Sequence, residues 1–286
     1  MWRSPEPRPE PRYDVASGLS MGRRDAQEDA VVTDFAAGVD CGLVVLADGM
    51  GGHEAGDVAS KILVTEVFSE LKFRSQGFPV DESRIPASMA HAVQSGNESL
   101  RAHVEAHPKL RGMGATLVSL VLVENRLFWM SVGDSPLYLL RGGRLSRLNE
   151  DHSLAPEIDL MAREGLLTEE AARDHPDRNS LTSVVMGGEI TKRDCPDTPF
   201  ALRADDVVIV ASDGLEFLGS ERIEELVDRY RTRRSDEIVC RLLEAVEALD
   251  DPDQDNVSVS VLKLNHMAPV RPSAAARADT LQGVPS

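Results

Sequence analysis

Residues 43–53 read Leu-Val-Val-Leu-Ala-Asp-Gly-Met-Gly-Gly-His, an apolar run that leads directly into an aspartate and a glycine-rich turn. The aliphatic run predicts a buried strand over 42–47, which places Asp48 at the end of that strand. Glycines allow the backbone to approach an ion closely and to present a carbonyl oxygen to it. Oxygen atoms are the ligands that magnesium and manganese prefer. An Asp-Gly pair is also an ordinary turn signal, so this stretch by itself leaves both interpretations open.

Acidic residues stand at the ends of other strand-like runs as well. Asp213 follows the run Val-Ile-Val-Ala-Ser, Asp134 follows Ser-Val-Gly, and Asp255 precedes an alternating apolar run. The adjacent pair Glu28 and Asp29 precedes Ala-Val-Val. Carboxylates that come together repel one another unless cations hold them. The recurrence therefore favours a shared site for divalent metal over a set of unrelated turns.

The pattern of apolar residues along the chain predicts sheets covered by helices. Strand-like runs lie at 42–47, 115–123, 127–132, 137–140, 207–211 and 257–264. Helical spacing of apolar residues appears at 58–71, 89–104 and 238–249. Short turns at 124–126 and 142–143 favour antiparallel pairing. The sequence therefore predicts a layered α/β sandwich with antiparallel sheets rather than a doubly wound parallel sheet.

The domain organisation follows from length and composition. The chain has 286 residues, of which 42% are hydrophobic, enough for one sizeable core. No internal repeat or change of composition divides it, so we expect one domain over 13–266. The flanking segments 1–12 and 267–286 are rich in proline, charge or small residues without periodicity, and we expect both to be disordered tails.

The charge and the cysteines indicate the kind of surroundings in which the protein works. A net charge of −17 would repel the phosphates of nucleic acid and anionic lipid, so we expect neither as a partner. No apolar run approaches the length of about 18 residues that suggests a membrane span, and the first residues lack the apolar region of a signal peptide. Three cysteines, far apart and without paired spacing, are typical of a reduced compartment. We therefore expect a cytoplasmic protein.

Seven short motifs share one order along the chain. They are RDAQED at 24–29, DGMGGH at 48–53, GMGAT at 112–116, VGDS at 132–135, DHS at 151–153, SDG at 212–214 and DN at 255–256. In this set and order the chain resembles the metal-dependent protein phosphatases of type 2C, in their bacterial form. Each motif alone is weak, and the common order over most of the chain carries the resemblance. It implies a four-layer α-β-β-α sandwich with two central antiparallel sheets flanked by helices.

The resemblance also implies a binuclear metal site. Asp48 would bridge two ions, either Mg²⁺ or Mn²⁺. One ion would also take Glu28 and the carbonyl oxygen of Gly49, and the other would take Asp213 and Asp255. Two cations that share a carboxylate lower the pKa of a water molecule and offset charge on phosphoryl oxygens, so no protein nucleophile is required.

Three further residues have roles that the resemblance implies. Asp29 would support the metal ligands from behind them, and Asp134 would help to bind a third, weaker ion. Arg24 would bind the substrate phosphate, since a planar guanidinium can engage two phosphate oxygens at once. Arg24 and Asp48 are thus the expected catalytic residues of an enzyme that hydrolyses phosphoserine and phosphothreonine in proteins.

Two residues depart from the family's pattern. Met50 stands where members with an Asp-Gly-His triplet have a histidine proposed as general acid, and methionine cannot donate a proton. Pro136 follows Gly-Asp-Ser, where many relatives carry arginine, so hydrogen bonding near the third ion is expected to differ. We interpret His53, beside the expected site, as a solvent-exposed turn residue and His152 as structural.

Residues 154–180 resemble the flap of the bacterial enzymes, a mobile element near the site. The stretch 161–178 predicts two short helices that are broken at Gly165 and ended at Pro176. Thr168, followed by two glutamates, predicts the start of the second helix. A role in the choice of phosphoprotein and a packed insertion without such a role are both open at this point.

The leading prediction is a phosphatase of phosphoproteins, which by resemblance would oppose a serine/threonine kinase. A regulatory phosphatase dedicated to one signalling partner is an alternative. A phosphoprotein-binding pseudophosphatase is another, but such a protein is expected to have lost ligands. Here Glu28, Asp48, Asp213 and Asp255 are all present.

Overall fold

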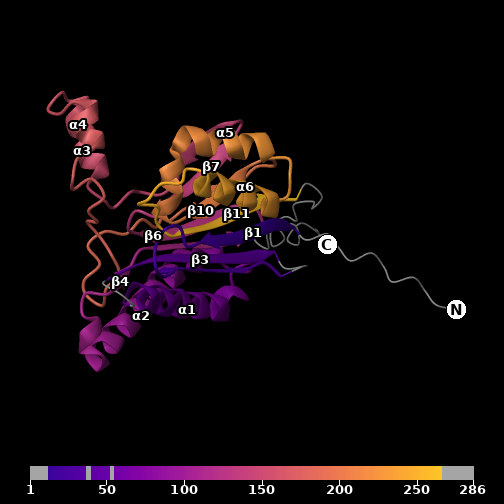
Figure 1. The fold of residues 1–286 in the computed structure, drawn as a ribbon. Helices are drawn as coiled ribbons and strands as arrows, with labels where there is room; N and C mark the ends of the chain where they lie inside the picture. The colour runs from indigo at the N-terminus through magenta and orange to yellow at the C-terminus, as the bar shows by residue number, and fades with distance from the viewer. Residues whose placement is uncertain (1–11, 37–39, 52–54, 266–286) are drawn as a thin grey trace, which may run out of the picture.

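The structure of the chain, a computed structural model, describes residues 12–36, 40–51 and 55–265. The predicted tails lie outside these residues, except for Arg12, whose guanidinium pairs with Asp40 at 2.7 Å. His53 lies outside them as well. Two antiparallel sheets are stacked face to face, and helices cover the outer side of each (Figure 1). This architecture confirms the predicted four-layer α-β-β-α sandwich.

The first sheet has the strand order β2-β3-β5-β6-β9. Its strands are β2 (Asp29–Asp34), β3 (Cys41–Met50), β5 (Leu117–Val123), β6 (Arg126–Val132) and β9 (Phe200–Ala201), and β4 (Gly114–Ala115) pairs with the end of β3. The aliphatic strand β3 lies between β2 and β5 and is buried along most of its length, as expected for a strand covered on both faces.

The second sheet has the order β1-β11-β10-β7-β8. Its strands are β1 (Tyr13–Ser20), β7 (Leu137–Arg141), β8 (Arg144–Arg147), β10 (Val207–Ala211) and β11 (Val257–Leu264). The predicted strands 207–211 and 257–264 coincide with β10 and β11, and the other four predicted strands are also present. The strands β1, β2, β8 and β9, which mix polar with apolar residues or are very short, were not predicted.

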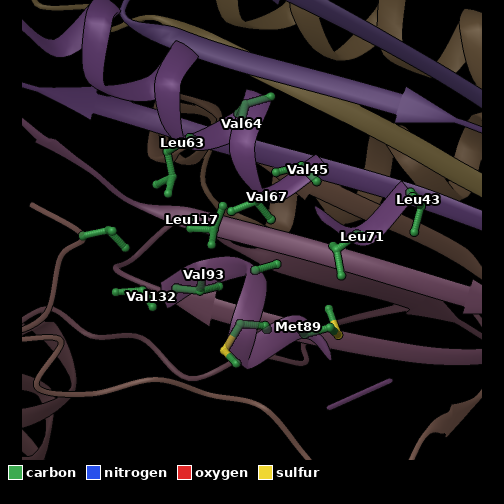
Figure 2. Close-up of a cluster of buried hydrophobic side chains, with 14 of the residues drawn as sticks. Leu43, Val45, Leu63, Val64, Val67, Leu71, Met89, Val93, Leu117 and Val132 are labelled. Carbon is green, nitrogen blue, oxygen red and sulfur yellow. The ribbon is translucent and has the colours of Figure 1, made fainter. Parts of the chain in front are cut away.

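The helices α1 (Ala55–Ser75) and α2 (Ile85–Ala106) cover the first sheet. Both confirm the helical spacing seen at 58–71 and 89–104. Figure 2 shows the contact, in which apolar side chains of both helices meet alternate residues of the sheet, namely Leu63, Val67, Leu71, Met89 and Val93 with Leu43, Val45 and Leu117. Burial of each such side chain contributes about 1.5–3 kcal/mol, so this layer holds β3 firmly from one side.

The helices α5 (Ser220–Tyr230) and α6 (Ser235–Glu247) cover the second sheet. The spacing at 238–249 predicted α6, whereas α5 was not predicted. Its buried residues Ile223, Leu226 and Val227 do have helical spacing, but they are separated by acidic and basic residues. A narrow apolar stripe on a highly charged helix is easy to overlook when the sequence is read alone.

The flap contains α3 (Ala155–Arg163) and α4 (Glu169–Arg173), which project from one end of the sandwich (Figure 1). No helix passes through Gly165, which has a φ of +76°, so the predicted break is confirmed. The hydroxyl of Thr168 accepts a 3.1 Å hydrogen bond from the amide of Ala171, as predicted for a helix start. The first helix begins earlier than the predicted stretch because Pro156 suits its first turn.

Three short 3-10 helices complete the described secondary structure: η1 (Glu82–Arg84), η2 (Pro108–Leu110) and η3 (Asp213–Leu218). Within residues 12–36, 40–51 and 55–265, no helix combines the length and apolar composition needed to cross a membrane.

Candidate metal centre

Asp48 lies on the face of β3 that is turned toward the second sheet. Side chains alternate along a strand, and Val44 and Leu46 pack in the core between the sheets, so Asp48 continues this inner series. Thr116 fixes the backbone on the neighbouring side. Its amide donates to the Asp48 carbonyl at 2.9 Å, and its hydroxyl accepts from the Asp48 amide at 3.2 Å. Asp48 is therefore held at the end of the inner core.

The strand β3 continues past its predicted end because Gly49 and Met50 pair with β4. A Cβ atom at Gly49 would lie 2.1 Å from the carbonyl oxygen of Gly56, so only glycine fits there. A Cβ atom at Gly56 would lie 2.8 Å from both the Gly49 carbonyl oxygen and Glu28 Oε1. These two oxygens, predicted to share an ion, thus border one small space that the two glycines leave free.

The second sheet contributes Asp213 and Asp255. Asp213 begins η3 just after β10, and Asp255 stands two residues before β11. The antiparallel pairing of β10 with β11 brings these two strand ends together. The guanidinium of Arg24 forms an ion pair with the Asp255 carboxylate, so the predicted phosphate ligand lies at the same place.

Asn256, a residue without a predicted role, ties the acidic N-terminal loop to β11. Its Oδ1 accepts a 2.7 Å hydrogen bond from the Glu28 amide. Its side-chain nitrogen donates to the carbonyls of Met21 at 2.9 Å and Ala26 at 3.0 Å. A buried amide with this many partners positions Glu28 beside Asp255. The motif at 255–256 was the only sequence signal that pointed to Asn256.

One cavity of about 570 Å³ joins the predicted site residues. Its lining includes Arg24, Glu28, Asp48, Gly49, Asp134, Asp213 and Asp255. Asp134 and Asp213 also line a larger cavity of about 1180 Å³, whose other walls come from the flap and from η3 and α5. The structure thus brings seven of the eight predicted residues to one cavity, and a wide approach adjoins it.

Asp29, the eighth predicted residue, lies outside that lining and is buried. It stands opposite Asp48 in the β2–β3 ladder. Its Oδ2 accepts a 2.7 Å hydrogen bond from the hydroxyl of Ser212, while its Oδ1 has no hydrogen-bond partner among the described residues. Ser212 and Thr116 had no predicted role, although they stand within the motifs at 212–214 and 112–116.

The electrostatics of these acids fit bound cations. Burial raises the pKa of Asp134 to about 7 and that of Asp29 to about 6, and neighbouring carboxylates add to both effects. The pKa values of Asp48, Asp213 and Glu28 are also raised, by burial first and then by nearby carboxylates. Within the described residues Asp213 Oδ1 is buried without a hydrogen-bond partner. Divalent cations would relieve this repulsion and satisfy that oxygen.

The carboxylates share a cavity without being closed around one point. In the described part of the chain, no three acidic, histidine or cysteine side chains form a ready ligand sphere. The fit to metal therefore rests on the common cavity, the glycine cradle and the oxygen donors.

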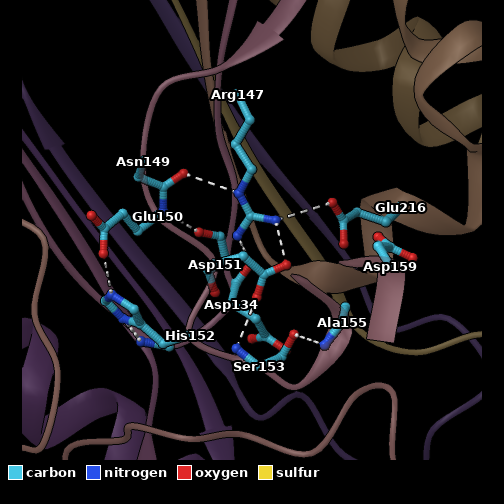
Figure 3. Close-up of polar contacts among 12 residues, drawn as sticks. Asp134, Arg147, Asn149, Glu150, Asp151, His152, Ser153, Ala155, Asp159 and Glu216 are labelled. Carbon is cyan, nitrogen blue, oxygen red and sulfur yellow. Dashed lines mark hydrogen bonds and ion pairs between the residues drawn. The ribbon is translucent and has the colours of Figure 1, made fainter. Parts of the chain in front are cut away.

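The loop that carries Asp134 is braced by His152. The Gly133 amide donates to His152 Nδ1 at 3.2 Å, and the His152 amide donates to the Gly133 carbonyl at 3.1 Å. His152 is only 1% exposed, and burial lowers its pKa. Figure 3 shows the ring packed beside the polar network around Asp134. These contacts give His152 the structural role expected from the sequence.

Comparisons with known proteins agree with this arrangement. The family described as protein phosphatase 2C matches residues 21–254. The chain is 34% identical over 223 residues to the serine/threonine protein phosphatase PstP of Mycobacterium tuberculosis, which covers 77% of this chain and 40% of that protein. It is 31% identical over 228 residues to the serine/threonine phosphatase stp of Listeria innocua, covering 79% and 85% of the two chains.

A solved structure supports the same relationship. The catalytic domain of PstP in complex with two manganese ions aligns with a TM-score of 0.70 and 32% identity, over 88% of this chain and 98% of that one. This chain spans about two fifths of the full length of PstP from Mycobacterium tuberculosis. The family match includes Arg24 through Asp213 and ends one residue before Asp255. The chain therefore belongs to the protein phosphatase 2C family, and its described residues form a domain of the bacterial serine/threonine phosphatase type.

Proposed function

We propose that this chain is a metal-dependent phosphatase that hydrolyses phosphoserine and phosphothreonine in other proteins. One observation carries the proposal: acids from both sheets border a single cavity that also contains Arg24. A site of this kind provides oxygen ligands for cations and a guanidinium for phosphate. PstP, which this chain resembles, contains two manganese ions in its solved structure, so we propose two core ions here, either Mn²⁺ or Mg²⁺.

The residues present suit two neighbouring ions. Asp48 lines the same cavity as the acids of both sheets and would bind both ions. Glu28 and the Gly49 carbonyl would complete one side, and Asp213 and Asp255 the other. When bound, the two cations lower the pKa of a water molecule that attacks phosphorus and offset the charge of the phosphoryl oxygens. Asp29 would support this set through its place beside Asp48 in the ladder.

Arg24 would exchange one partner for another as the site fills. Its guanidinium pairs with Asp255, and the Arg24 side chain is 53% exposed. A cation bound to Asp255 would compete for the same carboxylate. The guanidinium would then be free to bind two oxygens of the substrate phosphate. We therefore propose Arg24 as the phosphate-binding residue.

Asp134 is proposed as a ligand of a third, weaker ion. It borders both cavities, whereas Glu28 and Asp48 border only the smaller one. Met50 lines the smaller cavity and cannot protonate the departing serine or threonine oxygen. Water near Asp134 is our candidate for the source of that proton.

The larger cavity gives a rationale for protein substrates. It extends from the acid cluster to the flap helix α3 and to α5. A space of about 1180 Å³ accommodates residues that flank a phosphorylated side chain. We propose a cytoplasmic enzyme with phosphoproteins as substrates and a serine/threonine kinase as its opponent. A regulatory phosphatase dedicated to one partner would use the same site with a narrower choice of substrate.

Hydrolysis of p-nitrophenyl phosphate and of a phosphothreonine peptide, with manganese and with EDTA, tests this function. We expect activity with manganese and none with EDTA, because carboxylate and carbonyl ligands release these ions to a chelator. Asp213→Asn should lower turnover by several orders of magnitude, since it removes charge from the ion core. Asp197→Asn, an exposed acid outside both cavities, is the matched control and should leave turnover unchanged. Full activity of chelator-treated protein would refute the proposal.

A further inference from the structure

The side chain of Arg147, at the end of β8, touches three separate parts of the site region. Its Nη2 donates to the backbone carbonyl of Asp134, and its Nη1 donates to Asp151 Oδ2 at 3.1 Å. The same Nη1 lies 3.7 Å from Glu216 Oε1. Figure 3 shows the guanidinium between these groups, with Asn149 beside it. Arg147 lines the larger cavity together with Asp134 and Asp213.

The first contact concerns the loop that carries Asp134. Asn149 holds the same loop, because its Oδ1 accepts from the Leu137 amide at 2.8 Å and its nitrogen donates to the Ser135 carbonyl at 3.0 Å. Arg147 Nε donates to Asn149 Oδ1 at 3.3 Å. Pro136, inside the loop, has neither an amide hydrogen nor a charged side chain. The cationic support of this loop therefore comes from outside it, from β8.

The second contact leads to the root of the flap. Asp151 Oδ2 pairs with Arg147, and Asp151 Oδ1 accepts a 2.9 Å hydrogen bond from the amide of Ser153. The Ser153 hydroxyl accepts from the amide of Ala155 at 3.1 Å, where α3 begins. Asp151 thus has one oxygen on Arg147 and the other on the first residues of the flap. A displacement of the flap root would therefore move Asp151 and, through it, the guanidinium of Arg147.

The third contact leads to η3, which begins at Asp213. Glu216 Oε1 accepts a hydrogen bond from the hydroxyl of Tyr138 and lies close to Arg147. Burial and the Glu216 carboxylate raise the pKa of Tyr138 beyond its ordinary range, so the phenol stays a donor. Tyr138 of β7 thus holds Glu216 in place, and Glu216 connects Arg147 to η3, the helix that begins at Asp213.

We propose that Arg147 is a positioning residue that joins the flap root and η3 to the backbone of Asp134, so that the flap and the Asp134 metal position are coupled. The inference rests on the proposed function. Through Asp151, movement of the flap would shift the Asp134 loop, and an ion bound at Asp134 would in turn restrain the flap. Asp48, Glu28 and Asp255 lie outside these contacts, and Asp213 is reached only indirectly, through Glu216 and η3. We therefore expect Arg147 to affect the two core ions less than the Asp134 position.

The geometry requires arginine rather than a positive charge alone. A guanidinium presents donors in a fixed plane and can serve several acceptors at once, whereas an ammonium group is a point charge on a flexible chain. Lysine at 147 would reach one of the acceptors and leave the others without their donor. Arg144, on the same strand, is exposed and borders neither cavity. It offers a matched control of the same residue type.

The test compares Arg147→Gln, Arg147→Lys and Arg144→Gln with the unaltered full chain. Manganese binding is measured by titration calorimetry, and hydrogen exchange is followed over residues 155–178 with and without manganese. Because loss of a group that supports a metal ligand typically costs 10–100-fold in affinity, we expect both Arg147 variants to weaken the weakest manganese site about tenfold or more. Exchange over 155–178 should accelerate in both. The affinities of the two tighter sites should change less than that of the weakest site, and the Arg144 variant should behave like the unaltered chain.

Several results would overturn the proposal. They are unchanged weak-site affinity or unchanged flap exchange in Arg147→Gln, full retention of both in Arg147→Lys, and the absence of a third, weaker site in the unaltered chain. Exchange that accelerates evenly over the whole domain would show a general structural role instead. None of these measurements needs turnover. A chain without phosphatase activity would refute the proposed function, whereas the results on the Arg147 variants bear on the coupling alone. Absence of the third site would also remove the third ion proposed at Asp134.

Discussion

The hydroxyl of Ser212, beside β10 in the second sheet, donates a 2.7 Å hydrogen bond to the carboxylate of Asp29, on β2 in the first sheet, across 183 residues of sequence. Ser212 Oγ also accepts from the amide of Ser258 at 2.9 Å. Ser212 is fully buried. One hydroxyl therefore links both sheets at Asp29, the residue opposite Asp48 in the β2–β3 ladder, and the geometry of the site depends on how the sheets pack.

Replacement of this hydroxyl is expected to destabilise the fold. Ser212→Ala leaves the Ser258 amide and Asp29 Oδ2 without partners in a buried region, which costs about 1–3 kcal/mol of unfolding free energy. Ser83 makes a similar bond to Asp81, 2.6 Å long, at the surface, and Ser83→Ala should change stability by no more than about 0.5 kcal/mol. Urea unfolding of the two variants in EDTA measures the difference. Equal effects would show that the link between the sheets is not specific.

The raised pKa values predict how pH acts on the metal-free protein. Because the pKa of Asp134 is about 7 and that of Asp29 about 6 in the folded state, both groups bind more protons when folded than when unfolded. The unfolding free energy should therefore fall as pH rises from about 4 to about 7 and then level off. Thermal midpoints in EDTA across this range check the prediction, and a midpoint that rises steadily to neutral pH would contradict it.

Manganese should reverse that trend. Carboxylates bind cations only when they are deprotonated, so stabilisation by a fixed manganese concentration should grow over the same range of pH. The difference in thermal midpoint with manganese and with EDTA is the quantity to follow. Buffers without calcium and of constant ionic strength exclude effects of other divalent cations and of salt on the midpoint. If the difference in thermal midpoint did not depend on pH, the acids with raised pKa values would not be the metal ligands.

Arg24 and Arg23 form a matched pair of neighbours. Their side chains are equally exposed, at 53%, but Arg24 pairs with Asp255 in the candidate metal centre, whereas Arg23 pairs with Asp250 outside it. Arg24→Ala should raise KM for a phosphopeptide more than it lowers kcat, because it removes binding to the phosphate. Arg23→Ala should change neither value. If the Arg24 variant lost only kcat, with KM unchanged, the side chain would have a role other than phosphate binding.

Asp134→Ala should separate two kinds of substrate. Protonation of the leaving oxygen matters most when the leaving group is a poor one, and p-nitrophenolate scarcely needs it. We therefore expect a much larger fall in rate with a phosphothreonine peptide than with p-nitrophenyl phosphate, while the two core ions stay bound. Steady-state rates on both substrates, with metal content measured in parallel, decide this. Equal losses, or loss of the core ions, would show that Asp134 has a different function.

Elements with continuous aliphatic runs were the easiest to predict from sequence. The strands β10 and β11 have the predicted bounds, because β10 is a continuous buried aliphatic run and β11 alternates valine with serine over its buried first half. The strands β1 and β2 have partly exposed residues that interrupt the pattern. In helix α5, charged residues likewise interrupt the narrow stripe of apolar residues. Where an element is only partly buried, its pattern depends on neighbours that the local sequence does not contain.

The sequence by itself determined which side chains are proposed as oxygen ligands and as the phosphate-binding charge, because short motifs at strand ends carry Asp48, Asp213, Asp255 and Arg24 within a few residues of recognisable runs. Only the tertiary structure decided how these groups are held. The contacts of Ser212, Asn256 and Arg147 join segments from different strands and loops, and each forms only when the sheets and the flap root are in place. A hydrogen bond between distant segments has no local pattern, since its two partners are constrained by packing rather than by their spacing in the chain.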